Sequence, residues 1–347
     1  MNRKMVLLIS KAGNPKTAIN LVRYKPEEVV AIWDADHAGQ TSQTLLGLGG
    51  DIPVIQSLDQ APGANTLVIG IAPSGGRLPA DMRAKVLEAI ARRMAIVSGL
   101  HEFLSDDPEL SSAARLHNVP LVDVRKNTER DVAHRRNIRT DCLRIHTVGH
   151  DCNVGKMVVS LELAMALRHA GHDAKFVATG QTGMMIEGDG CPVDAVVVDF
   201  INGAAEKLVL ANQHHDILLI EGQGSISHPR YSAVTLGLLH GCMPQGLIFC
   251  YEMGREEVSG MPGFKIPPLE KLRALYETMG NLMHPCETIG IAVNGRKYSD
   301  AEVARECERV SAELGLPACD VLRHGPGKLV DGVLAFQKKL FARTSAS

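Results

Sequence analysis

The segment with the clearest chemistry is a glycine-rich turn between an apolar strand and an amphipathic helix. The run LRIHTVGHDCNVGKMVVSLELAMALRHAG spans 143–171, with Gly149 where the strand ends and the pair Gly155–Lys156 where the helix begins. Backbone N–H groups converge at such a turn, the helix dipole favours negative charge there, and a lysine adds a full positive charge. The sequence therefore predicts a phosphate loop, which binds the cofactor through Gly149, His150, Asp151, Cys152, Asn153, Val154, Gly155, Lys156 and Met157.

The spacing of this loop departs from the common G-x-x-x-x-G-K-[ST] pattern. Five residues separate Gly149 from Gly155 instead of four, and Met157 stands where a serine or threonine normally ligates Mg²⁺. A thioether is a poor ligand for this hard cation, and phosphoryl transfer relies on Mg²⁺ to neutralise developing charge. Acyl transfer from a thioester needs no metal. The loop therefore favours binding phosphates over transferring them, and we expect no metal site.

A second polar cluster, IEGQGSISHPRYS, follows another buried strand. Glu221 and His228 at such a strand end are natural general-base candidates. The alternative is that Glu221 caps neighbouring backbone N–H groups and that His228 lies on the surface. Backbone N–H groups of Gly222–Ser225, or Lys156, are candidate donors to an oxyanion that develops on a substrate. The predicted catalytic residues are therefore Glu221, His228 and Lys156.

Further polar residues stand near the ends of other predicted strands and are candidates for contacting a substrate. Polar turns after a strand commonly touch ligands, and paired cations in a crevice can bind carboxylate groups. For the lysine of this set, a structural ion pair is an equal alternative. The predicted substrate-binding residues are Lys175, Gln181, Thr182, Asp199, Arg230 and Arg255.

Short β-rich runs alternate with helix-length segments along the whole chain, which is the pattern of parallel sheets covered by helices. We expect a Rossmann-like domain over 1–126 that lacks G-x-G-x-x-G, a polar linker over 127–141, and a P-loop domain with a mostly parallel sheet over 142–343. The expected strands are Met5–Ile9, Glu28–Ile32, Thr66–Ile71, Ala95–Ser98, Pro120–Asp123, Leu143–Val148, Ala174–Thr179, Ile217–Glu221, Gly246–Tyr251 and Thr288–Val293. The expected helices are Pro79–Arg93, Lys156–His169, Pro268–Leu282 and Ser299–Leu314.

Composition limits the classes of function. The 347 residues carry 37 basic and 39 acidic side chains, so no net charge draws the chain to nucleic acid or to an anionic membrane. No apolar run approaches the roughly 20 residues that a transmembrane helix needs. The 8 cysteines include no C-x-x-C pair, which favours reduced thiols in a cytoplasmic protein. The expected partners are a small-molecule substrate and further copies of the chain in a homo-oligomer.

Three strings resemble the P-loop enzymes of the dethiobiotin synthetase type. GHDCNVGK resembles their G-T-D-T-E-V-G-K-T loop, KFVATG at Lys175–Gly180 their K-P-V-A-S-G, and IEGQGS at Ile220–Ser225 their V-E-G-A-G-G. In those enzymes the glutamate of the last string helps to hold the metal. This resemblance implies an ATP- and Mg²⁺-dependent ligase or kinase as one possible function.

A closer resemblance covers nearly the whole chain. IVSGLHEFL, TVGHDCNVGKM, ATGQTGMMIEGDG, VDFINGAAE, IEGQGSISHPRYS and LGLLHG together resemble a family long described only as a domain of unknown function. Some of its members are D-glutamate N-acetyltransferases. This resemblance implies an N-acyltransferase of D-amino acid metabolism, with acetyl-CoA as cofactor and the amine of an acidic D-amino acid as acceptor, D-glutamate first.

Overall fold

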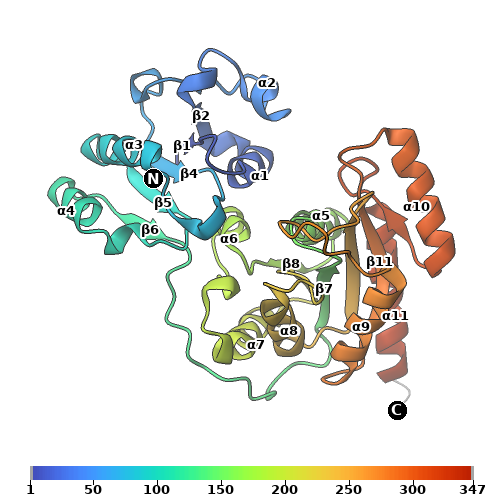
Figure 1. The fold of residues 1–347 in the computed structure, drawn as a ribbon. Coiled ribbons are helices and arrows are strands. Elements are labelled where there is room, and N and C mark those ends of the chain that lie inside the picture. The colour runs from blue at the N-terminus through green and yellow to red at the C-terminus, as the bar shows by residue number, and fades with distance from the viewer. Residues whose placement is uncertain (1–2, 345–347) are drawn as a thin grey trace. The chain divides into compact units, whose positions relative to one another are not determined.

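The computed structural model describes residues 3–344, so the first two residues of the expected N-terminal domain lie outside the described part. The chain forms two compact units (Figure 1). Unit 1 contains the residues up to Asn127 together with Met184–Ala195, and unit 2 contains Thr128–Gly183 and the residues from Val196 onward. Across residues 3–344 each unit is built around one parallel sheet of six strands. The expected α/β fold class is confirmed.

Unit 1 has the strand order β3-β2-β1-β4-β5-β6. This is the strand order of the Rossmann fold, in which the second and third strands are added on one side of the first strand and the fourth to sixth strands on its other side. Residues Met5–Leu8 of the first strand are completely buried. The strands are β1 Met5–Leu8, β2 Val29–Trp33, β3 Val54–Ile55, β4 Thr66–Ile69, β5 Ala95–Ser98 and β6 Leu121–Asp123, and the helices are α1 Lys16–Tyr24, α2 Ser42–Leu46, α3 Ala80–Ala91 and α4 Pro108–His117.

Unit 2 has the strand order β12-β11-β10-β7-β9-β8, again all parallel. The strand before the phosphate loop is therefore central. The strands are β7 Leu143–Gly149, β8 Ala174–Val177, β9 Ile217–Ile220, β10 Gly246–Glu252, β11 Glu287–Asn294 and β12 Ala318–Cys319. The helices are α5 Lys156–His169, α6 Gln181–Glu187, which crosses the boundary between the units, α7 Ile201–Asn212, α8 Ser232–Cys242, α9 Leu269–Asn281, α10 Asp300–Leu314 and α11 Gly327–Thr344.

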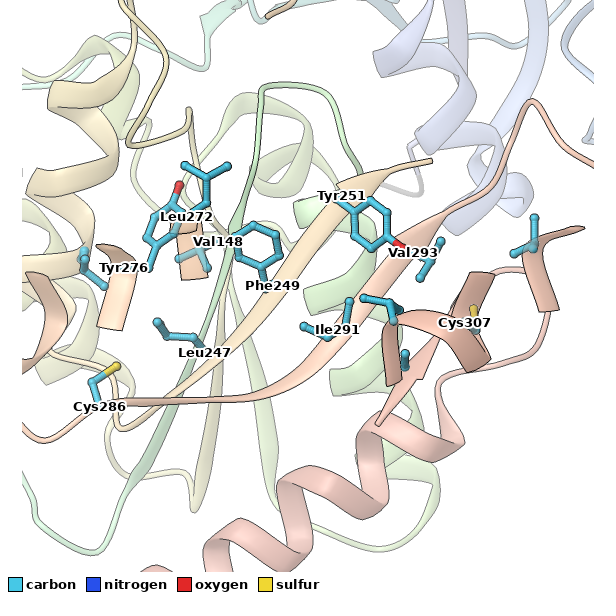
Figure 2. Close-up of a cluster of buried hydrophobic side chains, with 14 residues drawn as sticks. Val148, Leu247, Phe249, Tyr251, Leu272, Tyr276, Cys286, Ile291, Val293 and Cys307 are labelled. Atoms are coloured by element: carbon cyan, nitrogen blue, oxygen red, sulfur yellow. The ribbon is translucent and has the colours of Figure 1, made fainter. Parts of the chain in front are cut away.

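One face of the unit 2 sheet is held by a dense apolar cluster (Figure 2). Leu247, Phe249 and Tyr251 alternate along β10 and so point to the same face, as the two-residue period of a strand requires. Tyr276 of α9 packs edge-on against Phe249, with ring centroids 6.0 Å apart. This core fixes the carboxyl ends of β10 and β7 relative to each other.

The segment expected to be a linker has no helix or strand between residues 127 and 141. It is nevertheless held on unit 2, because the carboxylate of Glu206 on α7 accepts the backbone N–H groups of His134 and Arg135. A Cβ at Gly203 would lie 1.9 Å from the carbonyl oxygen of Asp131, so backbone and helix are in direct contact there. The segment is therefore anchored along α7 rather than hanging free.

Two observations bear on the environment of the protein. No helix within the described part of the chain is long and apolar enough to cross a membrane. All 8 cysteines of the sequence are free thiols.

Candidate functional site

The phosphate loop, residues 149–157, joins β7 to α5 at the centre of the unit 2 sheet. A Cβ at Gly149 would lie 2.7 Å from the carbonyl oxygen of Cys250, so only glycine fits beside β10. Gly155, at the N-cap of α5, has a φ of 106°, which glycine adopts without a steric penalty. These two glycines let the backbone turn tightly and present N–H groups at the start of the helix.

Lys156 and Asp151 brace the loop from within. The Lys156 side chain is buried, and its Nζ donates to the backbone carbonyl of Asp151 at 2.8 Å. The carboxylate of Asp151 is fully buried and accepts from the backbone N–H of Ser259 at 2.8 Å and from Arg255 Nη1 at 3.0 Å. Arg255 also donates to the carbonyl of Cys152 at 2.7 Å. Two cations therefore lie against the loop, and one buried carboxylate partly offsets them.

His150 ties the loop to β10. Its Nε2 accepts the backbone N–H of Glu252 at 3.0 Å. Burial, reinforced by the nearby Arg255 guanidinium, lowers the pKa of His150 to about 4, so the ring is neutral at physiological pH. The imidazole therefore acts as a fixed acceptor between loop and sheet.

Two cations that the sequence analysis missed extend this charged region. The buried Glu252 carboxylate pairs with Lys297 at 2.7 Å and with Arg296 at 2.7 Å, besides Arg255. Burial alone would raise the pKa of Glu252, but the hydrogen bond from Lys297 and the three positive charges outweigh it and lower that pKa. Arg296 and Lys297 are largely exposed and follow directly after β11. Their position shortly after the predicted strand Thr288–Val293 is the sequence signal that could have identified them as site residues.

The second loop, residues 221–231, begins with Glu221 at the end of β9. Its Oε2 accepts the backbone N–H groups of Thr179 at 2.9 Å and Gly180 at 3.1 Å, and its Oε1 accepts from Gln223 at 3.1 Å. A Cβ at Gly183 would lie 2.5 Å from the same carboxylate. Glu221 therefore caps the turn that leads from β8 into α6, which is the structural alternative considered for it above.

The second loop crosses directly over the phosphate loop. A Cβ at Gly222 would lie 1.7 Å from the carbonyl oxygen of Thr147 and 2.9 Å from Lys156 Cδ. Tyr276 links the two loops, because its hydroxyl donates to the Gly149 carbonyl at 2.9 Å and accepts the Ile226 N–H at 2.9 Å. Burial raises the pKa of Tyr276 to about 12, so the hydroxyl keeps its proton. Figure 2 shows this ring within the apolar cluster.

His228 is a buried residue of the second loop with an unused hydrogen-bonding atom. Its side chain is 1% exposed, and its Nε2 has no hydrogen-bond partner among residues 3–344. Nδ1 accepts the backbone N–H of Arg230 at 3.1 Å. A neutral ring with Nδ1 as acceptor carries its proton on Nε2. His228 is therefore a donor in this arrangement and not a base.

Asp151, Cys152 and His228 form a group of side chains around this atom. Their side-chain ligand atoms all lie within 4.8 Å of one another, and Asp151 Oδ1 is 3.8 Å from His228 Nε2. These residue types can hold Zn²⁺. For His228 to bind a metal through Nε2, its proton would have to move to Nδ1, where it would face the N–H of Arg230. The ring orientation therefore suits an incoming acceptor better than a cation.

The structure unites some of the predicted residues and separates others. The phosphate loop, Glu221, His228 and Arg255 lie at one edge of the sheet. Gln181 begins α6 directly after Gly180, whose N–H donates to Glu221, and Thr182 is buried in the first turn of that helix. The Arg230 side chain is exposed on the second loop.

Lys175 and Asp199 are not at this edge. Lys175 pairs with Leu218 in the first half of β8, away from the strand's carboxyl end. Asp199 is exposed in the 3-10 turn Val198–Phe200, which packs against α7 and α8. An apolar run before Asp199 suggested a buried strand end, but Val197 and Val198 are themselves about half exposed.

The fold and this site define a two-domain α/β protein, in which a Rossmann-like domain accompanies a P-loop domain with its phosphate loop at the centre of the sheet. Two family models match the chain in this arrangement. The Rossmann-like domain of unknown function DUF1611_N matches residues 35–127, and the P-loop domain DUF1611_C matches residues 131–330. The chain belongs to the DUF1611 family.

Relatives of known name and structure extend over most of the chain. A protein named D-glutamate N-acetyltransferase from Tritonibacter scottomollicae is 39% identical over 87% of this chain and 92% of its own length. A protein of the same name from Pseudoalteromonas sp. is 40% identical over 77% of this chain and 81% of its own. The crystal structure of a DUF1611 family protein from Anabaena variabilis ATCC 29413 is 37% identical, with a TM-score of 0.89 over 96% of this chain and all of that one.

Proposed function

We propose that this protein is an N-acetyltransferase that moves an acetyl group from acetyl-CoA to the amine of an acidic D-amino acid, with D-glutamate first. The shared name of two relatives, each about 40% identical across both domains, supports this substrate class. The observation that carries the choice of chemistry is the phosphate loop with a thioether at position 157.

The loop suits the phosphates of a CoA ester. Its backbone N–H groups converge at the start of the 14-residue helix α5, and the buried cation of Lys156 lies directly behind them. Arg296 and Lys297 add exposed positive charge close to Arg255. CoA carries a diphosphate and a separate 3′-phosphate, so this spread of charge matches more than one phosphate group.

Position 157 argues against phosphoryl transfer. Met157 is 6% exposed and packs into the core, so its side chain offers no oxygen to Mg²⁺. The nearby hydroxyls of Thr147 and Ser160 lie 2.9 Å apart and are hydrogen-bonded to each other. An oxygen ligand from the helix is thus missing at the place where a P-loop enzyme of phosphoryl transfer supplies it.

An ATP- and Mg²⁺-dependent ligase of the dethiobiotin synthetase type is the second candidate. The observation in its favour is the pair of buried carboxylates, Asp151 and Glu221, beside the loop. Both are already engaged, Asp151 by Arg255 and Glu221 by three N–H donors. A cation would have to displace these donors, so acyl transfer remains the better match.

We assign the following roles in acyl transfer. The Nε2–H of His228, which lies within 4.8 Å of the ligand atoms of Asp151 and Cys152 in the phosphate loop, donates to a phosphate oxygen of CoA, and backbone N–H groups of the second loop donate to the thioester oxygen as negative charge develops there. Arg230, exposed on that loop, binds a carboxylate of the amino acid. Glu221 holds the turn at Thr179 and Gly180 in place, and Lys156 binds phosphate. The sequence analysis offered Glu221 and His228 as bases, and the donor geometry of His228 leads us to reassign it.

The test measures both candidate reactions on the same preparation. With acetyl-CoA and D-glutamate we expect release of free thiol and an N-acetylated product by mass spectrometry, with L-glutamate slower. In parallel, phosphate release from ATP is followed with Mg²⁺ and with EDTA. The variant Met157→Thr restores the missing oxygen and should leave acetyl transfer nearly unchanged. EDTA-sensitive ATP hydrolysis by the native protein, without acetyl transfer, would favour the ligase instead.

A further inference from the structure

Three cations surround one buried carboxylate at the end of β10. The Glu252 side chain is 1% exposed and pairs with Arg255. The same carboxylate also pairs with Arg296 and with Lys297, each at 2.7 Å. Arg255 shares its charge with the buried Asp151, whereas the Arg296 and Lys297 side chains are 52% and 65% exposed. The Glu252 carboxylate therefore holds two exposed cations in place and neutralises only part of their charge.

These two exposed cations lie beside the phosphate loop. Arg255 links the two places, because its Nη1 donates to the carbonyl of Cys152 in the loop at 2.7 Å and its Nη2 pairs with Glu252 Oε2. Arg296 Nη2 lies 2.7 Å from that same Glu252 oxygen. The guanidinium groups of Arg255 and Arg296 are therefore neighbours, and one of them is already in contact with the loop.

The end of β11 is itself held against the loop. Asn294, the last residue of β11, donates to the carbonyl of Val154 at 3.1 Å, and a Cβ on Gly155 would lie 3.7 Å from Asn294 Nδ2. Arg296 and Lys297 follow shortly after Asn294 in the chain. Both cations are therefore anchored beside the loop by the fold.

A second phosphate group on the same ligand fits this arrangement. In CoA one ribose carries both the 5′-diphosphate and the 3′-phosphate, so a diphosphate on the loop leaves the 3′-phosphate one ribose away. Arg255 spans the corresponding short step between the loop and Arg296. A terminal phosphate offers several oxygens to a guanidinium fork and an ammonium group. Arginine and lysine each carry more N–H donors than one carboxylate contact engages, so donors remain for the phosphate.

We propose that Arg296 and Lys297 bind the 3′-phosphate of CoA and thereby select CoA esters over acyl donors that lack this group. This inference rests on the proposed function, which assigns the CoA diphosphate to the phosphate loop. Glu252 is a positioning residue, because it holds both cations beside that loop. Dephospho-CoA, ATP and the phosphopantetheine arm of a carrier protein have no 3′-phosphate, so this site distinguishes CoA from each of them.

The experiment compares two ligands that differ in this one phosphate. The native protein is titrated calorimetrically with CoA and with 3′-dephospho-CoA. We expect CoA to bind roughly tenfold more tightly, because two exposed charge-assisted contacts each contribute about as much as a good surface ion pair. Acetyl transfer to D-glutamate is then measured with the acetyl ester of each ligand. Because the 3′-phosphate is remote from the thioester, KM should be higher for the dephospho ester while kcat changes little.

A double variant assigns the preference to these two residues. Arg296→Gln combined with Lys297→Gln should lower the affinity for CoA to about the affinity for dephospho-CoA, so that the preference is lost. Arg255 remains as a partner of Glu252, so the buried carboxylate stays paired. Retained binding of dephospho-CoA shows that the variant is folded.

The matched control is Lys339→Gln. Lys339 is a half-exposed lysine of α11 that lies 2.7 Å from the carboxylate of Glu287, at the opposite end of β11 from Asn294. Its removal breaks an ion pair of the same length without approaching the loop. This variant should keep the preference of the native protein for CoA.

The outcomes distinguish this inference from the function on which it rests. Acetyl transfer by the native protein together with equal affinities for CoA and dephospho-CoA would overturn the 3′-phosphate site and leave the acetyltransferase intact. A preference for CoA that persists in the double variant would overturn the assignment to Arg296 and Lys297. No acetyl transfer to any amine by the native protein would overturn the proposed function itself.

Discussion

Replacing Lys156 with methionine tests whether the phosphate loop binds its ligand through charge. Lys156→Met keeps an unbranched side chain of similar length beside Gly222, whose hypothetical Cβ lies 2.9 Å from Lys156 Cδ. The variant removes the cation together with its hydrogen bond to the Asp151 carbonyl. Lys156 is 6% exposed, so its contact with phosphate is poorly screened by solvent. A charge-assisted hydrogen bond of this kind contributes about 1.5–3 kcal/mol, which corresponds to roughly ten- to a hundredfold weaker binding.

The assay is calorimetric titration of the native protein and the variant with CoA, at low and at moderate salt. We expect the native protein to bind CoA more tightly than the variant at both salt concentrations, because salt screens a buried ionic contact only weakly. Lys328→Met, which alters an exposed lysine of α11, is the matched control and should leave the dissociation constant unchanged. If Lys156→Met changes the dissociation constant by less than about threefold, the lysine does not contact phosphate and the reasoning fails.

Three further predictions concern stability and local order. Gly222→Ala should lower the free energy of unfolding in urea by about 1–3 kcal/mol or more, because its Cβ would overlap the Thr147 carbonyl. The control Gly327→Ala, where nothing lies within 4 Å of the new Cβ, should not lower it, and equal effects of the two variants would contradict this prediction. Burial lowers the pKa of His146 to about 4 from an unfolded value near 6.5, so the unfolded state binds the proton first as the pH falls. The free energy of unfolding should therefore fall by about 3 kcal/mol between pH 6.5 and 4. His146→Gln should reduce the dependence of the free energy of unfolding on pH by one proton, and an unchanged dependence would contradict this prediction. Glu206→Ala should make the segment 131–139 the first site of limited proteolysis, because the N–H groups of His134 and Arg135 lose their acceptor. Cleavage of this segment at the rate seen in the native protein would mean that other contacts hold the segment in place.

The sequence predicted the regular elements well where a period was long enough to read. The helix Lys156–His169 was predicted to the residue, and Thr288–Val293 lies within the observed strand β11. The edge strands β3 and β12 were missed, because two residues each leave no period to detect. Parallel strands buried on both faces give continuous apolar runs, which is why the central strands were the easiest to find.

The grouping of Met184–Ala195 with unit 1 had no signal in the sequence. Arg125 forms a two-armed ion pair with Asp194, whose carboxylate lies 2.8 Å from Nη2, although 69 residues separate them. A pairing between distant residues depends on the folded arrangement of both segments, and neither segment shows a pattern that marks the other as its partner. The same holds for Asp151 and Arg255 in the site, which are 104 residues apart.

The role of His228 shows why residue type alone did not settle the chemistry. An imidazole at a strand end is equally consistent with a base, a ligand or a donor. What distinguishes these roles is the backbone N–H of Arg230, two residues later, which occupies Nδ1 and directs the proton to Nε2. The sequence contains both residues but not the turn that brings them together.

The bracing of the phosphate loop bears on the kind of reaction that it supports. His150 fixes it to β10, Tyr276 fixes it to the second loop, and Asn294 at the end of β11 donates to the carbonyl of Val154 at 3.1 Å. These three hydrogen bonds hold the loop, and with it the directions of its N–H groups, before a ligand binds. Electrostatic stabilisation of this kind is strongest when the donors are already in place before the charge develops. On the proposed function, this braced loop binds the CoA phosphates, and the methionine at position 157 supplies no oxygen ligand for Mg²⁺.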